Sequence, residues 1–451
     1  MHWSTAQIID ATKGTLQRGG EDGSRLDGVG IDSRRMKLGM LFVPVRAERD
    51  GHDFIAAALA AGAGGCLVER GRVEAADRAR GAMAMVIEVA DTTDALAGLG
   101  SAARDRLGGP VVGITGSIGK TSTKDLAAAV LRTTMQVAAS ERSFNNELGV
   151  PLTLANAPGD TNVAVVEMGA RAPGHIRHLC NMARPTIGVV TAVAASHTAT
   201  FGTVEGVAAA KAELVRSLPA SGTAILNGDD PRVSAMAAHS AAEVLLWSAE
   251  GRRGADVTAH DIRIDDRLRA SFVLRTPWGS LPVALEARGA HQVGNALAAA
   301  SVALCCGVGL GEVGTGLALG QLSPWRMEVR FAAGGGLVIN DAYNANPTSM
   351  VAALRSLADL DVERRVAVLG AMAELGADEA DEHRRVAALA ASLDIEVIAV
   401  GTDLYGTAPE VDVAAASARL GVVGPGTAVL VKASRVVGLE RLATLLAPAE
   451  P

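Results

Sequence analysis

The sequence predicts an α/β protein in which parallel sheets are covered by helices. Short runs rich in Val and Ile alternate with Ala-rich segments of helical periodicity along most of the chain. This alternation is typical of parallel strands that are joined by helices. The length of 451 residues is about three times that of an average domain, so two or three domains are expected.

The expected strands are the apolar runs that end at a turn or a polar residue. We expect them at residues 110–115, 162–168, 186–193, 223–227, 337–343, 365–371, 396–401 and 427–433. Residues 255–287 consist instead of short alternating segments broken by turn residues, which predicts antiparallel strands. A helix is expected from about Gln292 to Cys305.

Gly and Pro interrupt the periodic segments at residues 106–110 and 320–331, and such interruptions mark domain boundaries. We therefore predict three domains: an N-terminal domain of residues 1–107, a central domain of residues 108–328 and a C-terminal α/β domain of residues 329–451.

Charge and hydropathy exclude several classes of function. The net charge is −7, the pI is about 5.8, and no block of Lys or Arg forms a basic stripe, so binding to nucleic acid or to an anionic membrane is disfavoured. The most apolar stretches are Ala/Gly-rich and too short to span a bilayer. We expect a cytoplasmic protein without membrane insertion. The four cysteines have no C-x-x-C spacing and are expected to be buried free thiols: Cys66, Cys180, Cys305 and Cys306.

Residues 112–124 read VGITGSIGKTSTK and predict a phosphate-binding loop. An apolar strand, a Gly-rich turn and a helix follow one another, and this arrangement points backbone N–H groups and the helix dipole at an anion. Lys120 is placed to reach the β- and γ-phosphates, and the hydroxyl of Thr121 to bind Mg²⁺. The spacing differs from the common Walker A loop, because Ile114 stands where its first glycine would be.

Three further polar residues follow the expected strands of the central domain. Glu167 ends the strand VVEMG, where a carboxylate can hold a metal ion. His197 follows the next strand, and Lys211 lies in the helical segment TVEGVAAAKAELVRSL. Taken singly, each also fits an ordinary role as a solvated or capping side chain. An N-K-x-D motif is missing from the sequence, which argues against a GTPase.

The order of several motifs resembles that of the Mur ligases of peptidoglycan synthesis. These motifs are TGSIGKTS, NNELGVPLTLA, VVEMGA, SHTATFG, AAAKAE and NGDDP. The family pattern T-G-x-x-G-K-[ST] fits residues 115–121 and explains the departure from Walker A. The stretches INDAYNANPTSMVAAL and DSRRMKLGMLFVPVRAERDGHDFI resemble the members that add D-alanyl-D-alanine, and the resemblance covers essentially the whole chain.

The resemblance implies an ATP-dependent, ADP-forming ligase with the three-domain architecture of the family. Its N-terminal domain would bind the UDP-linked substrate, its central P-loop-type domain ATP, and its Rossmann-like C-terminal domain the nucleotide and D-alanyl-D-alanine. The implied reaction joins D-alanyl-D-alanine to UDP-N-acetylmuramoyl-tripeptide through an acyl phosphate, in the cytoplasm and as a monomer, for cell wall synthesis, cell shape and division. Whether the tripeptide ends in diaminopimelate or lysine stays open.

Site residues follow from the same resemblance. The residues implied to hold ATP are Thr115, Gly116, Ser117, Ile118, Gly119, Lys120, Thr121 and Ser122 in the loop, Asn295 near the adenine, Arg326 near the γ-phosphate, and Asp341, Tyr343 and Asn344 at the ribose and base. Those implied to recognise the UDP-linked substrate are Ser33, Arg34, Asp50 and His52, with Asn145 and Asn146 between the two ligands.

Two Mg²⁺ sites are implied as well. Thr121 and Glu167 would bind the first ion and His197 the second. Lys211 matches a family lysine that CO₂ converts into an anionic carbamate, a metal ligand. The implied catalytic residues are therefore Lys120, Lys211, His197 and Arg326.

The sequence departs from the family pattern at Gln292, Ala199, Ala371 and Ala433, where Asn, Glu, Asp and Gly are usual. Because of Gln292 and Ala371, it stays open which residues contact the nucleotide or the amine at these two positions. Two alternatives stay open: a sibling activity, such as another Mur ligase or folylpolyglutamate synthase, and a non-catalytic nucleotide-binding module.

Overall fold

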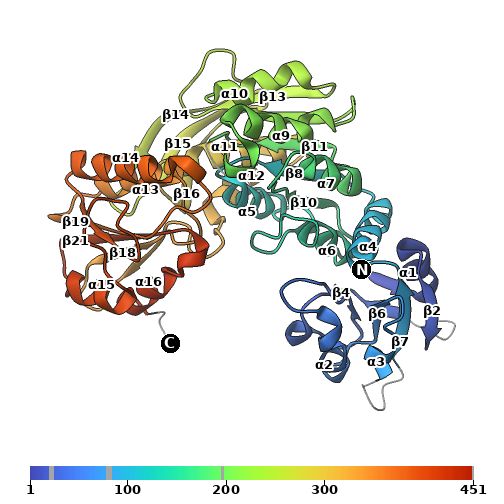
Figure 1. Cartoon of the computed structure of the whole chain (residues 1–451). Coiled ribbons are helices and arrows are strands. Elements are labelled where there is room, and N and C mark those ends of the chain that lie inside the picture. Colours follow the sequence, from blue (N-terminus) through green and yellow to red (C-terminus); the bar gives the residue numbers. More distant parts are fainter. Residues whose placement is uncertain (20–24, 78–83, 195–197, 449–451) are drawn as a thin grey trace. The chain divides into compact units, whose positions relative to one another are not determined.

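The computed structural model describes residues 1–19, 25–77, 84–194 and 198–448 (Figure 1). The chain forms two compact units. Unit 1 comprises Met1–Gly113, Met135–Gly169 and His175–Ile187, and unit 2 comprises Ile114–Thr134, Ala170–Gly174 and Gly188–Pro451. These units divide the chain differently from the three domains expected from the sequence, whose boundaries stay a prediction.

The largest sheet has nine strands in the order β16-β15-β14-β13-β12-β11-β8-β10-β9. In chain order they are β8 (Val111–Thr115), β9 (Val137–Ala139), β10 (Val163–Glu167), β11 (Ile187–Val190), β12 (Thr223–Asn227), β13 (Glu243–Ser248), β14 (Val257–Ile264), β15 (Arg269–Thr276) and β16 (Gly279–Arg288). β12, β13 and β14 pair in parallel, whereas β14, β15 and β16 pair antiparallel. The α/β class and the antiparallel strands predicted within residues 255–287 are thereby confirmed.

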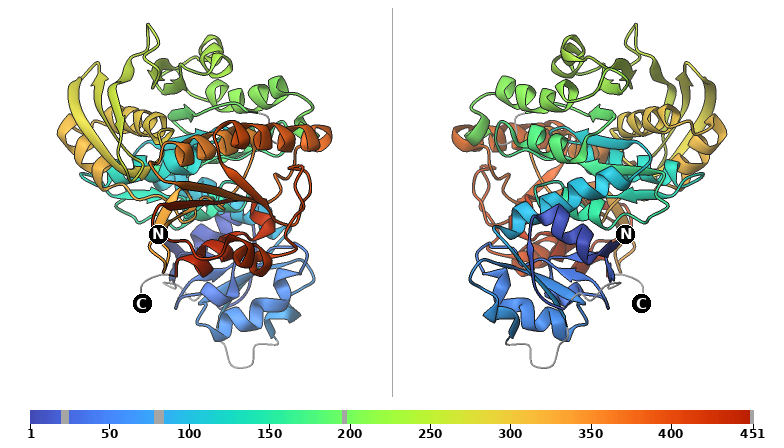
Figure 2. Two further views of the ribbon diagram at one scale, coloured as in Figure 1. Left: turned by 90° about the vertical axis from the view of Figure 1, so that its left-hand side faces the viewer. Right: turned by 90° about the vertical axis from the view of Figure 1, so that its right-hand side faces the viewer.

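Helices of unit 2 cover this sheet where Ala-rich segments were expected. They are α5 (Lys120–Leu131), α8 (Thr198–Phe201), α9 (Val204–Arg216), α10 (Pro231–Ser234), η3 (Ala235–His239), α11 (Gln292–Cys305) and α12 (Leu310–Leu319). The bounds of α11 are those predicted. Its small alanine side chains allow close packing against α5, while α12 packs against β16. Figure 2 shows the long strands β14 to β16 side by side in yellow.

Unit 1 contains a five-stranded sheet in the order β2-β7-β6-β5-β4 and a two-stranded ladder of β1 and β3. The strands of these two sheets are β1 (His2–Ser4), β2 (Thr15–Arg18), β3 (Arg25–Asp27), β4 (Val29–Gly30), β5 (Leu41–Phe42), β6 (Gly65–Glu69) and β7 (Met85–Val89). Its helices are α1 (Thr5–Thr12), η1 (Ser33–Arg35), η2 (Gly51–Phe54), α2 (Ile55–Ala60), α3 (Glu74–Asp77), α4 (Thr92–Arg106), α6 (Gly149–Ala155) and α7 (His175–Ala183). The buried Trp3 indole donates a hydrogen bond to the Ala155 carbonyl, 3.1 Å away, and so ties β1 to α6.

The C-terminal part of unit 2 is a sheet with helices on both faces. Its strand order is β17-β18-β21-β19-β20, with β17 (Glu328–Phe331), β18 (Leu337–Asn340), β19 (Arg364–Leu369), β20 (Glu396–Ala399) and β21 (Thr427–Lys432). All neighbours pair in parallel except β17 with β18. One core lies under α13 (Pro347–Ala358) and α14 (Glu379–Ser392), and the other under α15 (Val413–Leu420) and α16 (Glu440–Leu446) (Figure 1). In such a sheet, ligands bind at the carboxyl ends of the parallel strands.

The cysteines match expectation only in part. All four are free, and Cys66 and Cys180 are buried. The expectation of burial is wrong for Cys305 and Cys306, which are half-buried, because α11 ends there and the chain turns away at Gly307 (φ 85°). Among the described residues, no helix has the length and apolar character needed to cross a membrane.

Candidate active site

The predicted phosphate loop lies between β8 and α5, and two of its glycines are required by its geometry. Gly119 precedes the helix with φ 81°, and Gly116 has φ 151°. A Cβ atom at Gly116 would lie 1.9 Å from Thr191 Oγ1, and one at Gly119 would lie 2.5 Å from Asn295 Oδ1. Side chains of neighbouring residues therefore contact the loop directly at these two glycines. Any larger residue at either position would displace the loop.

The connection after β11 holds the loop in place. The Thr191 hydroxyl lies within hydrogen-bond distance of two carbonyls, Ile118 at 2.5 Å and Thr115 at 3.2 Å, and donates its one proton between them. The Ser117 N–H donates to the Ala192 carbonyl at 2.7 Å. Because the loop is fixed by the protein itself, its N–H groups at the start of α5 are preorganised for a phosphate.

Lys120 and Thr121 begin α5, and both face other polar groups. The Lys120 ammonium donates to the Gly116 carbonyl at 2.6 Å and so lies over the loop. The Thr121 hydroxyl accepts a hydrogen bond from the Arg326 guanidinium at 2.7 Å. The structure thus brings Arg326 to the predicted phosphate loop, and its place near the γ-phosphate stays a prediction.

The linker that carries Arg326 has an unusual backbone. Trp325 and Met327, on either side, have φ of 64° and 51°, in the left-handed region that side chains other than glycine rarely adopt. The Arg326 guanidinium also lies over the Tyr343 ring, 4.3 Å from its centroid. Strain of this kind is common where a functional side chain is held in place.

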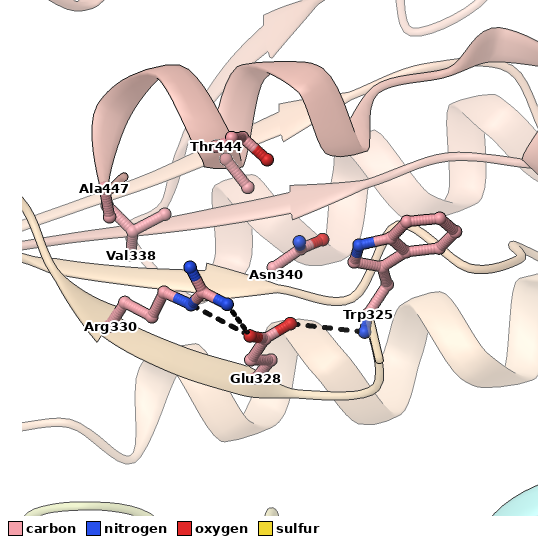
Figure 3. A pocket seen from close by; sticks show the side chains of 8 residues that line it. Trp325, Glu328, Arg330, Val338, Asn340, Thr444 and Ala447 are labelled. Atoms are coloured by element: carbon pink, nitrogen blue, oxygen red, sulfur yellow. Dashed lines mark hydrogen bonds and ion pairs between the residues drawn. The ribbon is translucent and has the colours of Figure 1, made fainter. Parts of the chain in front are cut away.

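A small cavity lies next to this linker, lined by Trp325, Glu328, Arg330, Val338, Asn340, Ala443, Thr444 and Ala447 (Figure 3). The Glu328 carboxylate accepts from the Arg330 guanidinium at 2.8 Å and from the Trp325 N–H at 3.4 Å. The cavity volume of ≈ 30 Å³ holds about one water molecule. It is therefore too small for a nucleotide or a peptide.

Asp341 and Asn344 follow β18, and both contact the buried Lys432. The Lys432 ammonium pairs with the Asp341 carboxylate at 2.5 Å and donates to the Asn344 carbonyl at 2.9 Å. Sequence reasoning did not single out Lys432, although the next residue, Ala433, was noted as a departure from the family pattern. The lysine fixes the turn that carries Asp341, Tyr343 and Asn344.

Asn295 is buried on α11 and belongs to a chain of hydrogen bonds. Its carbonyl oxygen accepts from the Thr123 hydroxyl at 3.2 Å, and its amide donates to Gln292 Oε1 at 2.8 Å. Gln292 also contacts the His291 ring at 3.0 Å. The unusual Gln292 therefore has an observable role in supporting Asn295, which faces Gly119 in the loop.

Lys211 lies on α9 with only 2% of its surface exposed. Burial, and next the positive charge of Lys120, lower the pKa of the Lys211 amine to about 7, against the opposing effect of Glu213. Within residues 1–19, 25–77, 84–194 and 198–448 its amine makes no recorded hydrogen bond or ion pair. A large fraction of this amine is therefore neutral, and nucleophilic, at neutral pH.

Unit 1 carries Glu167 at the end of β10, where it is 1% exposed. The Asn145 amide donates to Glu167 Oε1 at 2.8 Å. Asn146 has a local role instead, because its side chain accepts from the Gly149 N–H at 3.0 Å at the start of α6. Among the residues that the structure describes, Asn145 contacts another predicted site residue, whereas the side-chain hydrogen bonds of Asn146 are local.

Four of the residues predicted to bind the UDP-linked substrate lie in or directly before η1 and η2. Ser33 and Arg34 are in η1, and the exposed Arg34 pairs with Asp32 at 2.7 Å. The Asp50 carboxylate accepts from the His52 N–H at 3.0 Å, which holds the pKa of Asp50 well below its usual range. His52 is buried, donates from Nδ1 to Asp50 and accepts the Glu69 N–H with Nε2. His52 therefore uses both ring nitrogens within its own unit.

His197 lies outside the described residues. So does the side chain of Ala199, one of the four departures.

A sheet with a phosphate loop, together with a doubly wound C-terminal sheet whose linker arginine reaches that loop, defines a nucleotide-binding α/β enzyme. Three family models match the chain: "Mur ligase family, catalytic domain" at residues 25–104, "Mur ligase middle domain" at 114–303 and "Mur ligase, glutamate ligase domain" at 325–437. The chain belongs to the Mur ligase family.

Proteins similar to this chain indicate which members of the family it resembles. The UDP-N-acetylmuramoyl-tripeptide--D-alanyl-D-alanine ligase of Mycobacterium tuberculosis (strain ATCC 25618 / H37Rv) is 40% identical over 93% of this chain and 91% of its own length. The ligase of the same name from Escherichia coli (strain K12) is 36% identical over 88% and 85%. The crystal structure of MurF from Acinetobacter baumannii superposes with a TM-score of 0.86, 30% identity and 99% coverage of both chains. MurF ligase from Thermotoga maritima in complex with ADP gives a TM-score of 0.77, 27% identity and coverage of 93% and 96%.

Proposed function

We propose that this protein is an ATP-dependent ligase that joins D-alanyl-D-alanine to UDP-N-acetylmuramoyl-tripeptide and forms ADP and phosphate. The reaction belongs to peptidoglycan precursor synthesis, and we place the enzyme in the cytoplasm as a monomer. One observation carries the proposal: the chain resembles ligases of this name over nine-tenths of its length. The complete phosphate loop, which Arg326 contacts, supports it.

The chemistry requires a carboxylate to become an electrophile. A carboxylate oxygen of the tripeptide attacks the γ-phosphorus of ATP, and ADP leaves. The dipeptide amine then attacks the acyl carbon, loses a proton, and expels phosphate as the amide forms. Lys120 and Arg326 carry the positive charges that offset the repulsion between the anionic substrates and stabilise the transferring phosphoryl group.

The predicted metal-binding residues suit Mg²⁺, which needs only one or two carboxylates from the protein. They do not suit a metal ion that is held by protein side chains alone. Mg²⁺ usually binds one or two carboxylates together with phosphate oxygens and water. The described residues contain no group of three or more His, Cys, Asp or Glu that could hold a metal ion. We assign Thr121 and Glu167 to one ion, and His197 to a second. When bound, Mg²⁺ would neutralise charge on the phosphates.

We further propose that the Lys211 amine reacts with CO₂. The neutral nitrogen attacks the carbon of CO₂, an N–C bond forms and one proton is released, so that the neutral amine becomes an anionic carbamate suited to Mg²⁺. The lowered pKa of Lys211, about 7, supports this step because only the neutral amine can react.

We also propose which residues contact the nucleotide and the UDP-linked substrate. We assign Asn295, Asp341, Tyr343 and Asn344 to the nucleotide. We assign Ser33, Arg34, Asp50, His52, Asn145 and Asn146 to the UDP-linked substrate. The exposed guanidinium of Arg34 suits a diphosphate, because arginine binds phosphate oxygens in pairs.

Phosphate release tests the substrate assignment. The purified enzyme is given ATP, Mg²⁺ and UDP-N-acetylmuramoyl-tripeptide with D-alanyl-D-alanine, with a single amino acid, or with no amine. A parallel reaction contains a folate and glutamate. We expect turnover only with the dipeptide. Turnover with a free amino acid or the folate, but not with the dipeptide, would identify a sibling activity instead.

A further inference from the structure

The hydroxyl of Thr121 is bound by Arg326 at a buried position. The Arg326 guanidinium donates to Thr121 Oγ1 at 2.7 Å, and Thr121 is 3% exposed. Thr121 lies in the first turn of α5, directly after Lys120. The guanidinium therefore places a positive charge on the same oxygen that we assign to Mg²⁺.

One hydroxyl oxygen cannot serve both cations well. Mg²⁺ binds its oxygen ligands at short distances and in a strict geometry, so a guanidinium on the same oxygen would lie directly beside the ion. In a buried site, where water screens charge poorly, the repulsion between the two outweighs the gain from one hydrogen bond. The Lys120 ammonium lies over the same loop and adds to the positive charge there. Thr121 can therefore bind either Arg326 or Mg²⁺, but not both.

The linker that carries Arg326 is anchored on both sides without the contact to Thr121. Before Arg326, the Ser323 N–H donates to the Asp125 carboxylate on α5 at 2.7 Å. After Arg326, the Met327 N–H donates to the carboxylate of Asp341 at 3.1 Å. The guanidinium can therefore leave Thr121 by a movement of the side chain alone, while the linker backbone stays in place.

Tyr343 gives the guanidinium a second contact. The guanidinium carbon of Arg326 lies 4.3 Å from the centroid of the Tyr343 ring, and the Tyr343 N–H donates to the Trp325 carbonyl at 3.2 Å. A cation over the face of an aromatic ring is attracted by it, and this attraction does not depend on Thr121. When Arg326 gives up Thr121, its positive charge therefore keeps a partner.

We propose that Arg326 competes with Mg²⁺ for the hydroxyl of Thr121, so that metal binding releases the guanidinium for the phosphates. This inference rests on the proposed function, in which Thr121 binds Mg²⁺ and Arg326 the γ-phosphate, and it adds a switch to that site. Arg326 thereby raises the Mg²⁺ concentration that nucleotide binding requires, and its guanidinium is available to the γ-phosphate only once the metal is bound.

Binding of ADP separates this competition from a contact of Arg326 with the γ-phosphate, which ADP lacks. Calorimetry of the full-length protein with ADP at a series of Mg²⁺ concentrations gives the Mg²⁺ concentration at half-maximal binding. Arg326→Met removes the charge and keeps an unbranched side chain. Arg326→Gln also removes the charge and covers the case in which Arg326→Met does not fold. Arg330→Met is the matched control, because Arg330 pairs with Glu328.

We expect both Arg326 variants to need about fivefold less Mg²⁺ for half-maximal binding of ADP, which corresponds to the net value of one hydrogen bond. Their affinity for ADP in EDTA should not rise, because no metal competes for Thr121 there. Arg330→Met should need the same Mg²⁺ concentration as wild type to within about twofold, because an exposed ion pair contributes little.

Three results would overturn the competition. They are an unchanged or higher Mg²⁺ requirement in both Arg326 variants, an equal decrease in Arg330→Met, and a rise in ADP affinity that is as large in EDTA as in Mg²⁺. The proposed function fails separately. Wild-type protein that binds ADP with the expected response to Mg²⁺, but does not ligate D-alanyl-D-alanine, would refute that function and leave the competition standing.

Discussion

The guanidinium of Arg326 donates a hydrogen bond to the hydroxyl of Thr121, 2.7 Å away, although 205 positions separate the two residues in the sequence. Thr121 lies in the first turn of the helix that follows the phosphate loop, and Arg326 lies in the linker before the C-terminal sheet. The contact joins the two parts of unit 2 that we assign to ATP, and the first prediction follows from it.

Arg326→Ala should lower kcat by about 100-fold, because a positive charge aimed at the transferring phosphoryl group is lost. Steady-state phosphate release at saturating ATP measures this. Arg330→Ala is the control, since Arg330 lies four residues further on and pairs with Glu328. If the two variants lose activity equally, Arg326 has no special part in phosphoryl transfer.

Lys120→Ala should lower kcat by about 100-fold or more, since the variant lacks the ammonium that lies over the loop. Its circular dichroism spectrum and melting temperature should stay close to wild type, because the half-buried Lys120 side chain lies over the loop and not in the core. Lys13→Ala, at an exposed pair with Asp10, should leave turnover unchanged. Near-normal turnover in Lys120→Ala would refute the phosphate-loop assignment.

Lys211→Ala should lose most activity, and acetate or formate should restore part of it by supplying a carboxylate in place of the carbamate. Lys211→Arg should stay inactive with or without these anions, because a guanidinium remains charged and does not react with CO₂. Wild-type activity should fall when CO₂ is stripped from the buffer. Full activity of Lys211→Ala, with no response to carboxylates, would show that Lys211 is only a buried helix residue.

Lys211 also predicts a pH dependence of stability. Its pKa of about 7 in the folded protein lies below the value of about 10.4 for an unfolded chain, so the unfolded state holds the extra proton between these two values. The cost of burying Lys211 is therefore full below pH 7 and shrinks as the pH rises toward 10.

Lys211→Met should accordingly increase the free energy of unfolding more at pH 6 than at pH 9.5. Urea titrations in metal-free, CO₂-free buffer measure the difference at each pH. A difference that does not change with pH would mean that the lysine is not protonated on unfolding, contrary to its lowered pKa.

Gly119→Ala should abolish ATP binding or reduce it by at least about tenfold, since a Cβ there would meet Asn295 Oδ1 at 2.5 Å in a backbone with φ 81°. Calorimetry with ADP and Mg²⁺ gives the affinity. At Gly108 a Cβ would meet no atom within 4 Å, so Gly108→Ala should bind ADP normally. Equal affinity in the two variants would mean that the loop tolerates a side chain at Gly119.

The sequence predicts some elements to the residue and others only in part. The helix Gln292–Cys305 was predicted with its observed bounds, because a long Ala-rich run offers no alternative. The strand expected at residues 337–343 ends at Asn340. There the Asn340 side chain accepts from the Ala342 N–H at 3.3 Å and turns the chain.

The candidate site, like the helices and strands, can be predicted from the sequence only in part. Lys120 and Thr121 are evident from local spacing, because the loop motif is contiguous. The pair of Asp341 and Lys432 is not, since the two residues are 91 positions apart and meet only because β18 and β21 are neighbours in the sheet. Likewise, nothing near Met372 in the sequence indicates that His383 accepts its N–H, because that contact depends on how α14 packs.

The transfer of a carboxylate oxygen to phosphate tests the central claim most directly. UDP-N-acetylmuramoyl-tripeptide labelled with ¹⁸O in its terminal carboxylate is ligated to D-alanyl-D-alanine, and the released phosphate is analysed by mass spectrometry. Activation through an acyl phosphate predicts that each phosphate released carries one carboxylate oxygen. Phosphate without the label, formed while the amide product accumulates, would contradict this account.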